Sequence, residues 1–154
     1  MGGKIYIFRV GGLMNVSLER YKRRIEKARR TKVSYMNNAK WRKLFNAIEA
    51  SGQCTFPAQV KTIDGERTYP FSTSPGIYEA RDYTMDGKFC PIAFQDIEWL
   101  YIPATSEVER YNRNERLESK IIKYDISKLK NLLDGLGKFE YEYDENGLKL
   151  FGYR

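Results

Sequence analysis

The side chains best suited to chemistry in this sequence are carboxylates and tyrosines, because the chain contains no histidine. Histidine is the commonest general base and metal ligand, so its absence removes every Ser-His and Cys-His nucleophile pair. Cys54 and Cys90 stand far apart without C-x-x-C spacing. That spacing predicts buried thiols rather than a zinc site, with a disulfide as the alternative. We therefore expect no catalytic residue set, no metal and no cofactor.

Glu98 is the most informative of the acidic residues. It lies between Ile97 and Trp99 in an apolar strand, where an unpaired carboxylate would be costly. We expect a buried or half-buried carboxylate paired with Arg or Lys. The alternative is a functional carboxylate with a raised pKa, as a carboxylate-dependent hydrolase would need. The wider set considered for a metal or acid–base cluster is Asp64, Glu79, Asp82, Asp86, Asp96 and Glu98, several of them at turns that favour Asp locally.

Basic charge is concentrated at the N-terminus. Residues 1–43 carry 13 Lys/Arg against Glu19 and Glu26, a net charge of +11, whereas the remaining residues carry 14 against 18, a net charge of −4. The segment 17–32 is therefore the candidate for phosphate contacts with nucleic acid. A solvated helix without a role is the alternative, and a membrane surface would require a bulkier apolar face. The nucleic-acid candidates are Arg20, Arg23, Arg24, Lys27, Arg29 and Arg30.

Aromatic residues supply the candidates for protein recognition. Tyrosine is enriched at protein interfaces, and the chain has 12 of them. Tyr69, Tyr78 and Tyr83 lie in or beside predicted strands and, with Glu98, form the candidate protein-binding set. Trp41 and Trp99 sit within apolar patterns, which favours core packing over a stacking platform.

Three segments have the apolar spacing of helices. Ser17 is predicted to cap a basic helix that ends near Arg30. Asn38 is predicted to cap a second helix that ends at Gly52, and Asp125 is predicted to cap a third. The first has a narrow apolar face and would dock weakly or stand free. The apolar positions are Leu18, Tyr21, Ile25 and Ala28, then Trp41, Leu44, Phe45 and Ile48, then Ile126, Leu129, Leu132, Leu133 and Leu136.

Alternating and β-rich segments predict strands. Residues 97–102 are almost continuously apolar, which predicts a central strand covered on both faces. Residues 104–123 are strongly charged with poor apolar spacing, and we expect a loop or a short exposed helix. Residues 139–145 and 148–154 predict a hairpin with a type I′ turn at Asn146-Gly147, which places Tyr143 opposite Leu150 and Asp144 opposite Lys149. The other predicted strands are 4–10, 55–63, 66–71, 77–83 and 88–94.

This order of elements predicts an α+β fold, with two helices packed on one face of a mainly antiparallel sheet and a C-terminal β-hairpin. Residues 36–154 form the expected single domain, and residues 1–35 a basic arm. No segment is apolar enough to span a bilayer and no secretory signal is evident, so the expected location is the cytoplasm. The sequence does not indicate the oligomeric state.

Three segments together resemble a family of small bacterial proteins of unknown function. They are the Asn-x-Lys-Trp opening at 38–41, the Ile-Glu-Trp strand at 97–99 and the Phe-Gly-Tyr-Arg ending at 151–154, and the resemblance covers residues 36–154. Met36 then has the form of a natural start, with residues 1–35 as an extension. Small domains of this type resemble those that accompany bacterial toxins, which implies an immunity-like role by analogy.

The function that these observations favour is a non-enzymatic, cytoplasmic protein-binding domain, with an immunity-type inhibitor of a basic toxin as its specific form. Nucleic-acid association through the basic N-terminal helix is the first alternative. A carboxylate-dependent hydrolase is the second.

Overall fold

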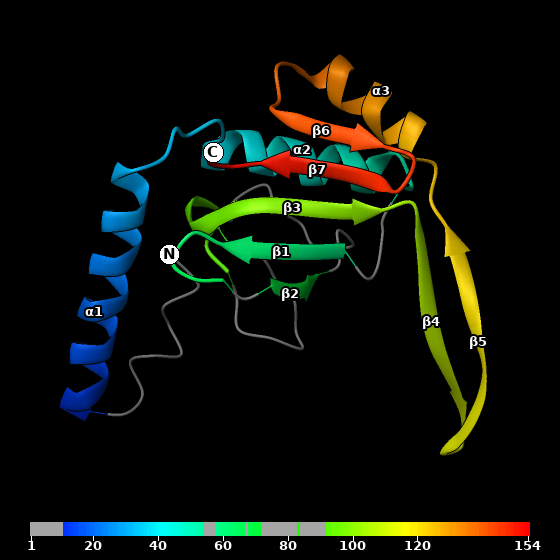
Figure 1. Cartoon of the computed structure of the whole chain (residues 1–154), viewed down its shortest axis with the longest axis horizontal. Helices are drawn as coiled ribbons and strands as arrows, with labels where there is room; N and C mark the ends of the chain where they lie inside the picture. Colours follow the sequence, from blue (N-terminus) through cyan, green and yellow to red (C-terminus); the bar gives the residue numbers. More distant parts are fainter. Residues whose placement is uncertain (1–10, 54–57, 67, 72–82, 84–91) are drawn as a thin grey trace.

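The computed structural model describes residues 11–53, 58–66, 68–71, 83 and 92–154. These residues form an α+β fold, as predicted (Figure 1). The predicted strand 4–10 and most of 77–83 and 88–94 lie outside them. In chain order the elements are α1 Gly11–Arg30, α2 Asn38–Ala50, β1 Ala58–Thr62, β2 Thr68–Phe71, the 3₁₀ turn η2 Phe94–Asp96, β3 Ile97–Pro103, β4 Thr105–Asn112, β5 Glu115–Lys123, α3 Ile126–Leu136, β6 Tyr141–Asp144 and β7 Gly147–Phe151.

Five strands form one sheet in the order β2-β1-β3-β7-β6, and each neighbouring pair is antiparallel. β3 lies at the centre, as its apolar sequence predicted. Helices α2 and α3 supply the residues that cover one face of this sheet. On the other face Trp99 and Tyr101 remain half-buried, so the prediction of full cover on both faces is wrong for β3.

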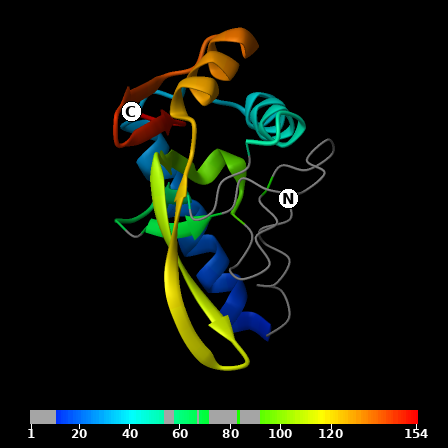
Figure 2. The same cartoon turned by 90° about the vertical axis from the view of Figure 1, so that its right-hand side faces the viewer.

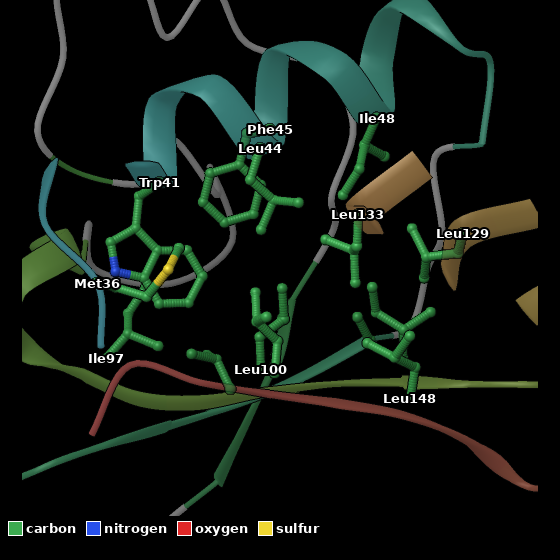
Figure 3. Packing of buried hydrophobic residues seen from close by; sticks show 14 of the residues in the cluster. Met36, Trp41, Leu44, Phe45, Ile48, Ile97, Leu100, Leu129, Leu133 and Leu148 are labelled. Atoms are coloured by element: carbon green, nitrogen blue, oxygen red, sulfur yellow. The ribbon is translucent and has the colours of Figure 1, made fainter. Parts of the chain in front are cut away.

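The main core lies between α2, α3 and the sheet. Trp41, Leu44, Phe45 and Ile48 project from α2 toward Leu100 and the strands beneath it (Figure 3). The rings of Trp41 and Phe45 stack with centroids 5.6 Å apart. Each fully buried side chain of this size contributes about 1.5–3 kcal/mol, so the i, i+3, i+4, i+7 face of α2 fixes the helix on the sheet.

The helix starts differ from the predicted positions. The N-cap of α2 is Asn37, whose side chain accepts a hydrogen bond from the Lys40 backbone N–H at 2.8 Å, so the prediction of Asn38 is wrong by one residue. Helix α1 begins at Gly11 rather than at Ser17. Asp125 caps α3 as predicted, accepting from the Lys128 N–H at 3.1 Å.

Residues 105–123 form a hairpin, β4–β5, and the prediction of a loop or short helix there is wrong (Figure 2). The turn residues Arg113 and Asn114 have φ of 48° and 72°, the two positive values that a type I′ turn requires. Most side chains on both faces are exposed. Without a buried face the hairpin lacks the apolar alternation that reveals a strand in sequence.

The C-terminal hairpin β6–β7 is present, but its register is shifted from the predicted one. Tyr143 pairs with Leu148 rather than Leu150, so the two-residue turn is Glu145-Asn146. The Asp144 carboxylate accepts hydrogen bonds from the Asn146 and Gly147 N–H groups at 2.8 and 3.1 Å. Gly147 is the first residue of β7, and a Cβ there would lie 2.5 Å from the Ile102 carbonyl oxygen of β3. The glycine therefore serves close packing, not turn geometry.

Candidate functional site

Helix α1 docks against the end of the sheet where β3 begins. Leu18 and Ile25 are buried, and Ile25 packs with Ile63 and Tyr153 in a small second core. Tyr21 and Ala28 lie against the same cluster. The predicted apolar positions are therefore correct, and the helix is docked rather than free.

The segment after α1 is joined to the C-terminal end of the chain by backbone hydrogen bonds. The Val33 N–H donates to the Arg154 carbonyl at 2.8 Å, and the Arg154 N–H donates to the Val33 carbonyl at 3.0 Å. The Tyr35 N–H donates to the Gly152 carbonyl at 2.9 Å. Residues 33–35 thus continue the sheet beyond β7 and fix the direction in which α1 leaves it.

Glu98 occupies an irregularity in β3. Between the pairs Lys61–Trp99 and Thr62–Ile97 the register shifts, which leaves Glu98 as the extra residue of a β-bulge. Its carbonyl accepts hydrogen bonds from the N–H groups of Gly152 and Tyr153, at 2.7 and 3.0 Å. The bulge explains how a carboxylate fits into an apolar strand, because it re-aims the side chain at the point where β3 meets α1.

The Glu98 carboxylate is buried and paired with two lysines, as predicted. One carboxylate oxygen lies 2.5 Å from Lys32 Nζ, and the other accepts a hydrogen bond from Lys61 Nζ. Burial alone would raise the pKa of Glu98, but the hydrogen bonds and charges of Lys32 and Lys61 outweigh it and lower that pKa. A carboxylate held in its ionised form by two ammonium groups is unsuited to act as a general acid.

Asp96 is the second buried carboxylate at this junction, with 2% of its surface exposed. It accepts a hydrogen bond from the Tyr21 hydroxyl, which ties α1 to η2. The Tyr153 hydroxyl donates to the Gln95 carbonyl at 2.6 Å; burial raises the pKa of Tyr153, which Arg29 partly offsets. A cavity of about 220 Å³ lies between α1 and η2 beside these groups. Their hydrogen bonds are structural, because each one joins two elements.

The six predicted nucleic-acid residues do not lie on a single surface. With 100° between successive residues of a helix, Arg20, Arg23, Lys27 and Arg30 fall opposite the docked side of α1, and all four are exposed. Arg24 and Arg29 are exposed as well, but each lies beside groups of the body. Arg24 lies 3.7 Å from Asp64, and Arg29 lines the cavity beside Asp96.

The predicted protein-binding residues are also separated. Tyr69 pairs with Val60 on the helix side of the sheet and is half-buried against the main core. Glu98 reaches Lys61, which lies on the opposite side. Tyr83 is half-buried and forms an isolated bridge with Ala93, and Tyr78 lies outside the described residues. These four residues therefore do not assemble into the expected aromatic and acidic face.

Trp99 differs from the expectation of core packing. It is half-buried on the sheet face that α2 and α3 do not cover, and the Lys149 ammonium lies 4.4 Å from its ring centre. Trp41 is in the core as predicted. Alternation along β3 places Leu100 on the helix side, so Trp99 falls on the other side.

The β4–β5 hairpin carries exposed apolar side chains that were not predicted from sequence. On the β4–β5 hairpin Ile121 is 66% exposed, Tyr111 60% and Leu117 39%. Ile121 pairs with Glu107, and Tyr111 lies four residues farther along the same strand, so both project from one face of the hairpin. The sequence signal for these exposed residues is the spacing of apolar residues among the charged residues of 105–123. That spacing can be interpreted only once both strands are known.

Neither a metal site nor a membrane-spanning helix is found in the described part of the chain. There, no three His, Cys, Asp or Glu side chains are grouped so as to hold a metal ion. None of the described helices is long and apolar enough to cross a bilayer. Cys54 and Cys90 lie outside the described residues, so their predicted state as buried thiols is not tested.

The described residues form a small α+β domain with two helices on one face of a five-stranded antiparallel sheet. Its two distinctive surfaces are the docked basic helix α1 and the projecting β4–β5 hairpin. The chain belongs to a family of unknown function, DUF6678, which matches residues 23–154. The resemblance to an uncharacterised family is thereby confirmed, and the match begins inside α1 rather than at residue 36. No curated protein and no solved structure matches the chain.

Proposed function

We propose that this protein is a non-enzymatic protein-binding domain of the cytoplasm that engages its partner through the β4–β5 hairpin. The observation that supports this function is the exposure of Tyr111, Leu117 and Ile121 on a hairpin that extends away from the body (Figures 1 and 2). Large apolar and tyrosine side chains at such a site are characteristic of interface anchors.

The stability of the hairpin also favours a partner. An isolated two-stranded hairpin is marginally stable in water, and additional strands or a helix are usually needed to support it. Within the described residues β4 and β5 pair only with each other. Their outer edges therefore present unpaired backbone groups, which a partner strand can satisfy.

The charges of the hairpin indicate a protein rather than a nucleic acid at this site. Residues 105–123 contain four acidic and five basic side chains, so neither sign dominates. Glu109 already pairs with Arg116 at 3.1 Å. Such a surface recognises its partner through apolar contact and matched polar groups, not through a long-range field.

Neutralisation of a toxin is the specific form of this function that we propose for testing. The neighbouring gene product, co-expressed with the full chain, should be bound at a fixed stoichiometry and lose its toxicity. Tyr111→Ala together with Ile121→Ala should abolish both effects. Tyr143→Ala serves as the matched control, because Tyr143 is an exposed tyrosine on β6, outside the β4–β5 hairpin.

A photo-crosslinker at position 121 tests hairpin binding without assuming the partner. It should capture one polypeptide in the native host, and Tyr111→Ala should reduce that capture at least tenfold. Equal capture by a crosslinker at the exposed Lys138 would contradict the assignment.

A further inference from the structure

The outward face of α1 is a second surface with a distinct character. Docking directs Leu18 and Ile25 into the body, and this leaves Arg20, Arg23, Lys27 and Arg30 in a row on the far side of the helix. We infer that this row, the basic stripe, binds the phosphate backbone of double-stranded nucleic acid without reading its sequence.

The geometry of the stripe suits a polyphosphate. Its four residues recur at i, i+3, i+7 and i+10, so they span about 15 Å along the helix axis at 1.5 Å per residue. Duplex DNA carries about one negative charge per 1.7 Å of its axis. Because α1 is fixed to the sheet by its apolar side and by residues 33–35, the cations are held in line before a ligand arrives.

Few acidic side chains compensate the stripe. In the described part of the chain, Arg20, Arg23 and Lys27 form no ion pair, whereas Arg30 lies 3.3 Å from Glu26 in an exposed pair. An exposed i, i+4 pair is weak and exchanges readily with a phosphate. The cost of releasing these cations from existing partners is therefore small.

The residues on the outward face of α1 favour one class of anionic ligand over the others. A membrane-surface helix needs bulky apolar residues directed at the lipid, but between Leu18 and Arg30 the bulky aliphatic residues of α1, Leu18 and Ile25, are buried. Proteins that bind single strands stack bases on aromatic side chains. Tyr21 is the aromatic residue between Leu18 and Arg30, and it faces the body through its hydrogen bond to Asp96. Sequence-independent binding of a duplex needs only cations spaced to contact its phosphates.

This inference does not depend on the proposed function. The stripe lies on α1 and the hairpin lies at the other end of the described structure (Figure 1). Loss of partner binding through Tyr111 and Ile121 would leave duplex binding unchanged, and the reverse also holds.

The test measures affinity of the full chain for a random-sequence 20-base-pair duplex as a function of salt, by fluorescence anisotropy. With four phosphate contacts the slope of log K against log[salt] should be about −3.6. Arg20, Arg23, Lys27 and Arg30 are replaced together by Gln. The matched control replaces the exposed residues Lys120, Lys123, Lys128 and Lys138 by Gln, which removes the same charge from residues outside α1.

The stripe variant should lose at least 100-fold in affinity at low salt and retain a slope shallower than about −1, whereas the control keeps a slope near −3.6. The triple variant Arg20→Lys, Arg23→Lys, Arg30→Lys should bind like the wild type, which separates loss of charge from loss of folding. Equal losses in the stripe and control variants, or no binding of the wild type at low salt, would overturn the inference. Stripe-dependent binding that is tighter to single strands, to anionic vesicles or to a polyglutamate peptide would overturn the duplex assignment.

Discussion

Replacement of Glu98 by Gln tests whether the bulge in β3 is structural. The substitution keeps the shape of the side chain but leaves Lys61, 13% exposed, and Lys32, 33% exposed, without their counter-charge. A hydrogen bond to a buried charged group contributes about 1.5–3 kcal/mol, and the exposure of Lys32 reduces its share. We expect unfolding to cost about 2 kcal/mol less in Glu98→Gln than in the wild type.

The assay is denaturant unfolding followed by tryptophan fluorescence, with the slope of the transition compared between variants. Glu142→Gln is the matched control, because its exposed pair with Arg154 at 2.6 Å should be worth less than about 0.5 kcal/mol. The double variant with Lys61→Met should lose less than the two single losses combined, since Lys61 is then no longer a stranded charge.

The stability that ionised Glu98 contributes should depend on pH. The pKa of Glu98 is lowered from its ordinary value of 4.5 in the folded state, because Lys32 and Lys61 together outweigh the burial that raises it. The stabilisation is therefore complete above about pH 4.5 and is lost as pH falls through the folded-state pKa. The stability difference between wild type and Glu98→Gln should shrink over the same range. A loss no larger than that of Glu142→Gln, or a difference that persists unchanged at low pH, would refute the reasoning.

Two further changes test the packing. A chain that starts at Met36 lacks Leu18 and Ile25. We expect it to lose about 2–4 kcal/mol in the free energy of unfolding, because the cost of ordering the helix offsets only part of the gain from burial. An unchanged denaturant midpoint would instead show that residues 1–35 are a separable arm, as the sequence suggested. Gly152→Ala should destabilise by about 1–3 kcal/mol or more, because its Cβ would overlap the carbonyl oxygen at the start of β3. Gly135→Ala is the control: it has open space around it inside α3, and it should stabilise by about 0.5–1 kcal/mol. Thermal melts that rank the two glycine variants in the opposite order would contradict the packing.

Local patterns were sufficient where one face of an element is buried. The apolar positions of α2 and α3 were predicted because burial of one helix face imposes a period of 3.6 on the sequence. The same reasoning placed Leu18 and Ile25 on the docked side of α1. For Glu98, the cost of an unpaired charge in an apolar strand predicted a basic partner.

Features without a buried face, or set by contacts between distant residues, required the tertiary structure. The β4–β5 hairpin was missed because both of its faces are solvated, and the β6–β7 register was wrong because Gly147 serves packing rather than the turn. Sequence named six basic residues as one set, but only the docked structure separates the four opposite the docked side of α1 from Arg24 and Arg29, which lie beside Asp64 and Asp96. The sequence indicates which residues favour burial or need a charge partner. Which residues form a common surface depends on contacts between segments that are distant in the chain.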